Sequence, residues 1–284
     1  MEELLEVEFL DSLKDYGFEI ASFNELFKNI DLNTHFMTKP HRIKFYHILY
    51  FTKSNDYHFI DFKNYKIEDN TLLFLSKDQV HSFSKTANYE GFVILLTDEF
   101  LKRNLLNLEK SMFNILLKPS ILEKASSKYK FLFEELYKDY KNNSLYKEKL
   151  NSSLFNYIIL KAQEDISKQN LANINEKYTL IYNKFKNHLY NNYNKNRSVN
   201  FYSDLLKITP KHLNVICKEH SKLNTKQIID NYIILEAKRR LISTNKAIKE
   251  ISYELGFIET TNFVKYFKKH TNISPSVFRQ SHII

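Results

Sequence analysis

Four side chains between residues 260 and 270 have types and spacing that suit contact with a nucleic acid. Thr261, Val264, Lys265 and Lys268 recur at intervals of three and four, which places them on one side of a predicted helix. Lysine can donate to guanine or phosphate, threonine to base edges, and valine can touch a thymine methyl group. The pattern predicts a helix that enters a DNA groove, although this stretch alone also fits an ordinary amphipathic surface helix.

A second copy of this arrangement lies about fifty residues upstream. Lys211, Asn214, Val215 and Lys218 repeat the outward set with an offset of 50, and the preceding helix repeats with an offset of 49. The single extra residue is a loop adjustment, so the sequence predicts two helix-turn-helix units. The sets expected to face the core are Leu213, Ile216, Cys217 and His220 in the first unit, and Phe263, Tyr266, Phe267 and His270 in the second.

Ten side chains of the two units are candidates for contact with DNA. They divide by chemistry into hydrogen-bonding groups for base edges, valines for thymine methyl groups, and lysines further along each helix for phosphates. Any one of them could instead be a solvated surface residue. The base-edge candidates are Lys211, Asn214, Thr260, Thr261, Asn262 and Lys265, the apolar candidates are Val215 and Val264, and the phosphate candidates are Lys218 and Lys268.

The elements that position these side chains have recognisable beginnings. Thr209 followed by Pro210 suits a helix start, because threonine caps free backbone donors and proline at the first helical position loses no hydrogen bond. Ser274 and Pro275 repeat this device at the last helix. Residues 225–243 contain no glycine or proline and predict one continuous helix, which would set the distance between the two units.

Residues 233–279, IILEAKRRLISTNKAIKEISYELGFIETTNFVKYFKKHTNISPSVFR, resemble the C-terminal signature of AraC/XylS-type transcriptional regulators. The resemblance covers about the last hundred residues and implies a DNA-binding domain with two helix-turn-helix motifs bridged by a long helix. Two positions depart from the family pattern. Ala247 replaces a frequent capping serine, which predicts some fraying, and Asn272 replaces a glycine at a turn whose left-handed backbone asparagine tolerates.

Charge is distributed unevenly along the chain, whose formal net charge is +9. Residues 171–284 hold 19 Lys and Arg against 8 Asp and Glu, whereas residues 1–170 hold 23 against 25. A basic part joined to a nearly neutral part predicts a polyanionic partner at one end only.

The region from residue 42 to residue 96 predicts an antiparallel sheet folded into a barrel or a sandwich. Its runs IKFYHILYF, DYHFIDF, TLLFL, QVHSF and GFVILL are short, aromatic and β-branched, and polar turns separate them. The region resembles the cupin-like effector-binding domain found at the N-terminus of many AraC-type regulators. The resemblance implies an α+β chain, with a β-barrel and flanking helices followed by the all-helical domain, and a ligand in the mouth of the barrel.

Helices are expected after the strands. The first two cover residues 129–141 and 145–166, and the second has a stripe of Leu150, Leu154, Tyr157, Ile158 and Lys161 predicted to be buried. The family resemblance favours a homodimer contact there. A third helix, to about residue 191, is built on Leu180, Ile181, Phe185 and Leu189. The predicted domains are residues 1–166 and 177–284, joined by a polar linker at 167–176; residues 1–38 suggest only an amphipathic arm.

Four histidines in the strand region raise the question of metal chemistry. His41, His47, His58 and His81 could gather around an ion as in cupin enzymes, but those enzymes use an HxH pair and this sequence has Ile43 where the second histidine would stand. We therefore expect neither metal nor cofactor. The candidates for effector contact are Arg42, Tyr46, His47, His58 and His81, although histidines can also be satisfied core residues and Arg42 can pair with a surface acid.

Other features narrow the function class. The acidic start MEELLEVEFL lacks an export signal, no apolar run is long enough to cross a membrane, and Cys217 lies on a core-facing stripe. These features predict a cytoplasmic protein. We expect a non-enzymatic, sequence-specific DNA-binding transcriptional regulator that reads two successive major grooves of double-stranded DNA and responds to a small-molecule effector. The alternatives are a metal-dependent cupin-type enzyme with an accessory helical domain, and a regulator whose N-terminal domain only dimerises.

Overall fold

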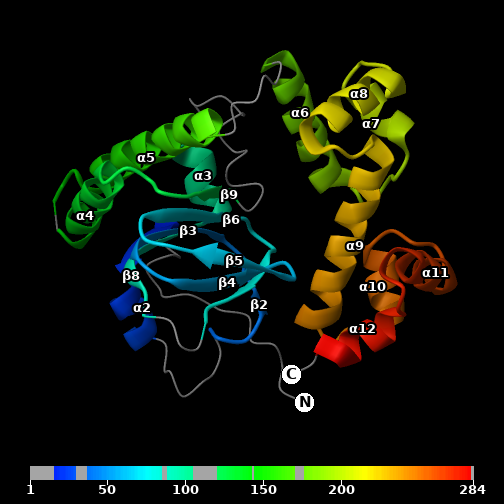
Figure 1. The fold of residues 1–284 in the computed structure, drawn as a ribbon, viewed down its shortest axis with the longest axis horizontal. Coiled ribbons are helices and arrows are strands. Elements are labelled where there is room, and N and C mark those ends of the chain that lie inside the picture. Colours follow the sequence, from blue (N-terminus) through cyan, green and yellow to red (C-terminus); the bar gives the residue numbers. More distant parts are fainter. Residues whose placement is uncertain are drawn as a thin grey trace. The chain divides into compact units, whose positions relative to one another are not determined.

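The structure is a computed structural model that describes residues 16–29, 37–84, 88–104, 120–142, 144–169 and 176–282 (Figure 1). The chain divides into two compact units, residues 5–171 and residues 172–284. The first contains all the described strands together with helices, and the described part of the second is helical. The first residues of the expected linker, 167–169, belong to helix α5 (Lys147–Gln169). The limits expected for the two domains and their linker stay a prediction.

Two antiparallel sheets form the centre of the first unit. In the described residues, the larger sheet has the order β1-β8-β3-β6-β9 and the smaller one the order β2-β7-β4-β5. Their segments are rich in aromatic and β-branched residues, which favour extended backbone. The strands are β1 (Phe18–Ser22), β2 (His41–Arg42), β3 (Tyr46–Lys53), β4 (Asp56–Ile60), β5 (Lys63–Ile67), β6 (Thr71–Leu75), β7 (Val80–Ser82), β8 (Glu90–Leu96) and β9 (Ser120–Leu122).

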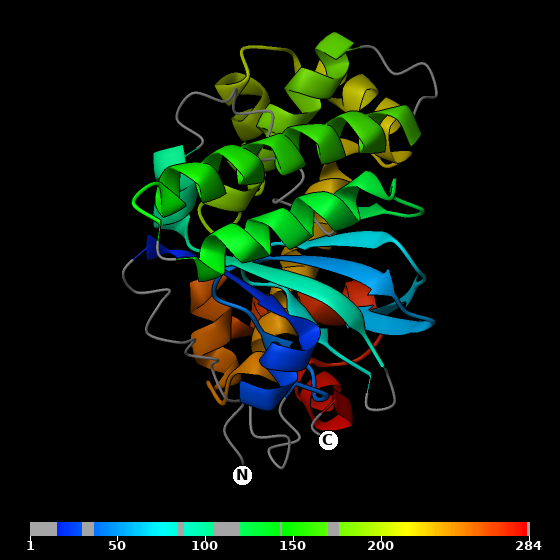
Figure 2. The ribbon, with the colours of Figure 1, turned by 90° about the vertical axis from the view of Figure 1, so that its left-hand side faces the viewer.

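Strand β3 shows how the sheets are layered. Its alternate residues face opposite sides, as the two-residue period of a strand requires. Tyr46, Ile48 and Tyr50 belong to the core between the larger sheet and the helices, whereas Leu49 and Phe51 belong to the core between the two sheets. Figure 2 shows helices α4 (Lys128–Lys141) and α5 lying side by side over the sheet.

The predicted antiparallel, cupin-like arrangement is confirmed, but its sheets do not close into a barrel. In the described part of the chain the two sheets share no strand pairing, so the unit is an open, two-sheet form of the cupin-like fold. Strands β1, β2, β5 and β9 were not expected from the sequence. Strand β1 and helix α2 (Phe23–Asn29) occupy part of the expected amphipathic arm, of which residues 1–15 and 30–36 lie outside the described residues.

The predicted buried stripe of α5 is wrong in part. Ile158 is fully buried, but Leu150 and Tyr157 are exposed. The buried face instead consists of Asn151, Phe155, Ile158, Ile159 and Ala162. The first unit also contains the short helix α3 (Asp98–Asn104), which packs Phe100 and Leu101 into the core next to the larger sheet.

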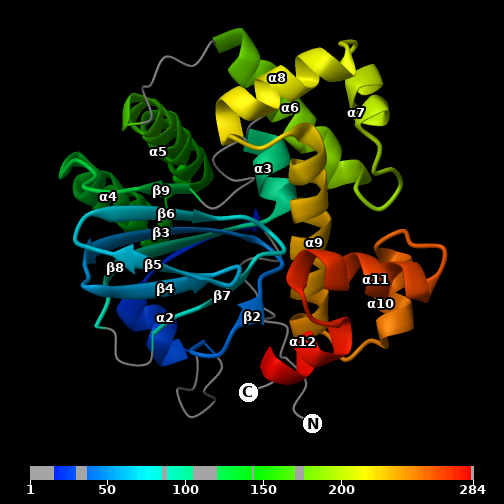
Figure 3. The same cartoon turned by 45° about the vertical axis from the view of Figure 1, so that its right-hand side comes forward.

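The second unit is built around helix α9, whose bounds, Thr225–Ser243, match the prediction. Asn224 begins it with a reciprocal cap, in which its side chain accepts from Gln227 N and its own N–H donates to the Gln227 side chain. Figure 3 shows α7 and α8 near one end of α9, with α10, α11 and α12 near the other. The other helices are α6 (Glu176–Asn192), α7 (Val199–Leu205), α8 (Pro210–Ser221), α10 (Ile248–Glu254), α11 (Thr260–Thr271) and α12 (Pro275–His282).

The two helix-turn-helix units repeat one another in backbone detail. Lys207 and Gly256, at equivalent places in the two turns, both have a left-handed backbone with φ of 54° and 78°. Lys222 and Asn272, which end the two second helices, have φ of 61° and 65°. The turn also repeats its hydrogen bonds, since Ile208 N donates to Ser203 O at 3.0 Å and Phe257 N to Ser252 O at 2.9 Å. The structure therefore confirms the doubled helix-turn-helix.

The caps expected at the helix starts are present. Thr209 Oγ1 accepts from His212 N at 3.1 Å, and Ser274 Oγ accepts from Val277 N at 3.3 Å. Ala247 offers no side-chain cap to α10, but its backbone N–H donates to the Glu250 carboxylate at 2.6 Å. That contact satisfies one donor at a helix start that lacks a serine.

Candidate nucleic-acid interface and buried histidine cluster

Helix α8 presents three of its four candidate side chains to solvent. Lys211, Val215 and Lys218 are exposed, while Leu213, Ile216 and Cys217 on the opposite side are fully buried. Asn214 is half-buried, and its Oδ1 accepts from Thr225 N at 3.1 Å. Asn214 therefore ties the end of the first unit to the start of α9 through its amide oxygen. Burial raises the pKa of Cys217 to about 11, which fits a core thiol rather than a reactive one.

Helix α11 presents a similar surface. Thr261, Asn262, Lys265 and Lys268 are exposed, and Phe263 and Phe267 are fully buried behind them. Val264 and Thr260 are half-buried. The Thr260 hydroxyl lies 3.2 Å from the Ser252 hydroxyl of α10, so it helps to join the two helices of its own unit.

The inward assignment of His270 is wrong. His270 is exposed, and its ring lies against that of Tyr266 with centroids 4.7 Å apart. Position 270 follows the same helical period as Phe263 and Phe267, but the buried stripe ends before it is reached. His270 is the next-to-last residue of α11, which ends at Thr271. Its counterpart His220 is half-buried and stacks on Tyr182 at 4.9 Å.

The four candidate lysines, Lys211, Lys218, Lys265 and Lys268, differ from other lysines of the second unit in their ion pairs. Lys226 and Lys246 form ion pairs with Asp230 and Glu254. Within the described residues, none of the four candidate lysines pairs with a carboxylate. Unpaired, exposed cations on the outward faces of both helices are suited to phosphate and base-edge acceptors.

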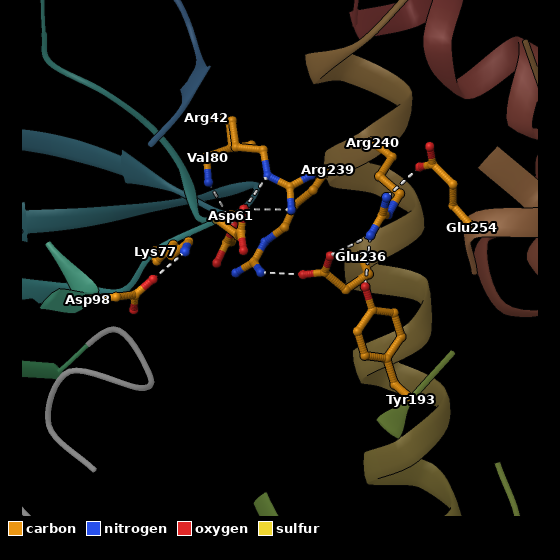
Figure 4. Close-up of polar contacts among 11 residues, drawn as sticks. Arg42, Asp61, Lys77, Val80, Asp98, Tyr193, Glu236, Arg239, Arg240 and Glu254 are labelled. Carbon is orange, nitrogen blue, oxygen red and sulfur yellow. Dashed lines mark hydrogen bonds and ion pairs between the residues drawn. The ribbon is translucent and has the colours of Figure 1, made fainter. Parts of the chain in front are cut away.

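Polar contacts made by α9 hold the second helix-turn-helix in place, and the sequence did not reveal them. Tyr266 donates its hydroxyl hydrogen to Asp230 of α9 at 2.7 Å. Arg240 of α9 donates to the Tyr193 hydroxyl at 2.8 Å and to the Glu254 carboxylate of α10 at 2.5 Å (Figure 4). These contacts join segments far apart in the chain, and no periodicity in the sequence signals them.

The four candidate histidines lie together in the first unit. His58 Nε2 and His81 Nδ1 are 3.0 Å apart. The His41 and His47 rings lie 4.4 Å and 5.1 Å from the His81 ring between centroids. Phe83 packs edge-on against His58. The strands therefore bring an imidazole cluster, comprising His41, His47, His58 and His81, to one place among aromatic rings.

Burial makes these imidazoles poor bases. It lowers the pKa of His58 to about 3 and that of His41 to about 4, and it holds those of His47 and His81 well below the ordinary value. Both ring nitrogens of His47 are buried without a hydrogen-bond partner, as are His58 Nδ1 and His81 Nε2. Such orphaned polar atoms are costly in an apolar core, at about 1–3 kcal/mol each, so a site with these groups favours a partner that can bond them.

Arg42 and Tyr46 lie apart from the histidine cluster in their contacts. The Arg42 guanidinium pairs with Asp78 at 3.0 Å, which is the surface-acid alternative raised by the sequence. Tyr46 faces the helix side of β3, and its hydroxyl donates to Asp98 at 3.2 Å. The same Asp98 carboxylate also accepts from Lys77 (Figure 4). Of the five effector candidates, the structure brings together His47, His58 and His81.

Two family models match this chain. One, described as a helix-turn-helix domain, matches residues 202–281, and the other, described as an AraC-like ligand binding domain, matches residues 29–157. Together they cover both the doubled helix-turn-helix and the histidine cluster. Among the described residues, no group of three or more His, Cys, Asp and Glu side chains is arranged to hold a metal ion.

Similar proteins include regulators. The chain is 26% identical over 110 residues to the raffinose operon transcriptional regulatory protein RafR of Pediococcus pentosaceus, covering 39% of this chain and 40% of that protein. It is 29% identical over 89 residues to the bifunctional transcriptional activator/DNA repair enzyme AdaA of Bacillus subtilis (strain 168), covering 31% of this chain and 42% of that protein. The match thus spans about two fifths of each relative.

A solved structure of similar extent is that of ToxT from Vibrio cholerae O395. It is 15% identical, with a TM-score of 0.44, and the match covers 94% of this chain and 98% of that one. None of the helices in the described ranges combines the length and apolar character needed to cross a bilayer.

Proposed function

The chain belongs to the AraC/XylS family, and on that premise we propose that it is a sequence-specific transcriptional regulator that binds double-stranded DNA through both helix-turn-helix units. The observation that carries the proposal is the repeated pair of helices α8 and α11. Each buries an apolar side; α8 exposes Lys211, Val215 and Lys218 on the other side, and α11 exposes Thr261, Asn262, Lys265 and Lys268. Those groups match the donors, acceptors and methyl contacts that a major groove offers.

The side chains divide the work of binding by their chemistry. Lys265, Thr261 and Asn262 would contact base edges near the start of α11, and Lys211 would do so on α8. Lys218 and Lys268, further along their helices, would neutralise phosphates. The two helices would enter successive major grooves on one face of the duplex, about 34 Å apart.

The histidine cluster is the proposed site of effector binding in the first unit. Its neutral imidazoles supply both donors and acceptors, and the unpaired ring nitrogens of His47, His58 and His81 favour a small molecule that can both donate and accept hydrogen bonds. A ligand there would stabilise one state of the unit and so shift how often both recognition helices meet DNA. Thermal shift with small acids, sugars and lipids would find such a molecule, because a ligand that prefers the folded state raises its stability.

The matched control for that screen is His47→Leu. The variant removes two orphaned nitrogens, so an effector that raises the melting temperature of the wild type should fail to raise that of the variant. A panel that shifts neither protein would favour the alternative in which the first unit only dimerises.

We propose a homodimer formed through the outer face of α4 and α5. This face exposes several large apolar side chains, more than a solvated helix pair needs. Sedimentation of wild type and Tyr157→Lys would check it, because a charge at the centre of the contact should favour the monomer. The exposed side chains are Phe131 of α4, Leu150, Tyr157 and Leu160 of α5, and Leu145 and Tyr146 of the loop that joins the two helices.

The decisive experiment is selection of bound duplexes from random sequence with the full chain, followed by footprinting on the enriched sites. The proposal expects two protected patches per protomer, one helical turn apart. Affinity should fall steeply as salt rises, because phosphate neutralisation releases counterions. A single protected patch, or binding that ignores salt, would refute the two-groove proposal.

A further inference from the structure

Residues 193–197, in the segment between α6 and α7, touch the second helix-turn-helix although that segment leads into the first. Arg197 Nη2 donates to the Leu255 carbonyl at 2.8 Å. Its guanidinium carbon lies 3.4 Å from the centre of the Phe257 ring. Both contacts fall in the turn between α10 and α11, so a residue just before the first unit holds the turn of the second.

Gly256 shows how closely the two segments approach. A Cβ placed on Gly256 would lie 1.7 Å from the Asn194 carbonyl oxygen. Left-handed backbone alone does not require glycine here, because Lys207 adopts the same conformation at the equivalent place in the first turn. The glycine is therefore required by the neighbouring backbone of Asn194 as well as by its own φ.

Further contacts extend this junction in both directions. Tyr193, at the other end of the segment, accepts from Arg240, which also binds Glu254 of α10. Arg197 lies 6.0 Å from the ring of Tyr266 on α11, whose hydroxyl is bonded to Asp230 of α9. The segment thus reaches α9, α10, α11 and the turn between the last two.

We infer that residues 193–197 form a second connection between the two helix-turn-helix units, in addition to α9. Within it, Arg197 is a positioning residue that fixes the separation of the two recognition helices. This inference rests on the proposed DNA-binding function. Helix α9 alone would let the units adjust by bending. Two connections close a loop through the domain, and a closed loop resists such adjustment because both connections must deform together.

The physical consequence is a strict preference for one spacing in DNA. Each base pair inserted between the two contacted grooves moves the second groove by roughly 3.4 Å and turns it by roughly 35°. A rigid pair of units cannot follow that movement and loses one set of contacts. A pair joined by α9 alone can follow part of it, so loss of Arg197 should make the protein tolerant of altered spacing.

The test measures dissociation constants of the full chain on a duplex enriched by the wild type and on the same duplex with one or two base pairs inserted between its two protected patches. The penalty for one inserted pair should be about tenfold smaller for Arg197→Ala than for wild type, which corresponds to about 1.4 kcal/mol. Arg197→Lys keeps a donor and a cation near Phe257, so it should retain most of the wild-type penalty.

Lys195→Ala is the matched control, because Lys195 is an exposed cation in the same segment. It should leave the spacing penalty unchanged even if it weakens binding to every duplex. Duplexes that carry only one of the two patches report whether each unit of Arg197→Ala is still folded and specific.

The outcomes separate this inference from the function on which it rests. A spacing penalty that is equal in wild type and in an Arg197→Ala protein that still binds single patches would overturn the inference alone. An Arg197→Ala protein that loses single-patch binding, with no restoration in Arg197→Lys, would show a merely structural role and would also overturn it. Enrichment of no duplex by the wild type would overturn the proposed function.

Discussion

The Tyr266 hydroxyl of α11 donates to the Asp230 carboxylate of α9 at 2.7 Å, and the same carboxylate accepts from Lys226. Asp230 is buried, so its charge needs these partners. Burial and the neighbouring carboxylate raise the pKa of Tyr266, which keeps the phenol protonated as the donor. The second recognition helix is thereby anchored to the connecting helix by one hydrogen bond to a charged group.

Tyr266→Phe should lower the free energy of unfolding by about 1.5–3 kcal/mol, because it removes a hydrogen bond to a charged group and leaves Asp230 less well satisfied. Urea denaturation of the full chain, monitored in the helical unit, would measure the change. Tyr253→Phe is the control, since Tyr253 is an exposed tyrosine of α10. Equal stability of the two variants would contradict the role assigned to the Tyr266 hydroxyl.

Lys265→Ala should weaken binding to the preferred sequence by about 1–3 kcal/mol and relax preference at one base position. Lys268→Ala should instead weaken binding on all sequences alike and reduce the salt slope by about 1. Both lysines are exposed on α11. Titrations on matched and mismatched duplexes at several salt concentrations distinguish the two roles. A uniform loss for Lys265→Ala would identify it as a phosphate contact.

Asn214 has one structural contact, with Thr225, and one proposed contact with DNA, and Asn214→Asp should separate them. The aspartate keeps the oxygen that accepts from Thr225 N, and its charge is favourable at the start of α9, so the free energy of unfolding should be maintained. The same charge should repel phosphates and lower DNA affinity by about tenfold or more. Asn214→Ala loses the acceptor and should lose stability by about 1 kcal/mol. Unchanged affinity in Asn214→Asp would place Asn214 away from DNA.

The histidine cluster should make the first unit sensitive to acid. The folded state holds the pKa of His58 at about 3 and of His41 at about 4, below the ordinary value of about 6.5. Between these pH values the unfolded chain therefore binds protons that the folded unit does not bind. The stability of the folded unit, fully present above pH 6.5, falls as the pH drops from 6.5 through 4 toward 3. Each histidine adds a slope of up to about 1.4 kcal/mol per pH unit.

Urea denaturation of the first unit between pH 7.5 and pH 5 would measure that slope. His58→Phe should flatten it, because the variant removes one group that must stay neutral when folded. His270→Asn, which changes an exposed histidine of α11, should leave it unaltered. A slope that is the same in all three proteins would show that other groups control the acid response.

Sequence reasoning worked where a local pattern carries the structure. The apolar period of α8 and α11, the caps at Thr209 and Ser274, and the uninterrupted run that became α9 each depend on residues within a few turns of one another. The repeated offset then joined these patterns into a doubled unit. The same period placed His270 inside, because a sequence pattern does not show where a buried stripe ends.

The errors arose where contacts join distant parts of the chain. Strand β5 was missed because most of its side chains are polar and face solvent, so it lacks a clear strand pattern. The stripe on α5 was misassigned because its period fits two neighbouring faces equally well. Arg197 and Leu255 are 58 residues apart, and only the folded backbone shows that Asn194 leaves no room for a side chain at Gly256.

The two recognition surfaces have the same backbone conformation but different sets of side chains. Where α8 has Lys211 and Val215, α11 has Thr261 and Lys265 at the equivalent places. A pair of helix-turn-helix units with different side chains has a direction, because exchanging the two units would give a different order of chemical groups. In the proposed complex, a single protomer bound to an asymmetric site would therefore distinguish one direction along the double helix from the other without any symmetry in the DNA.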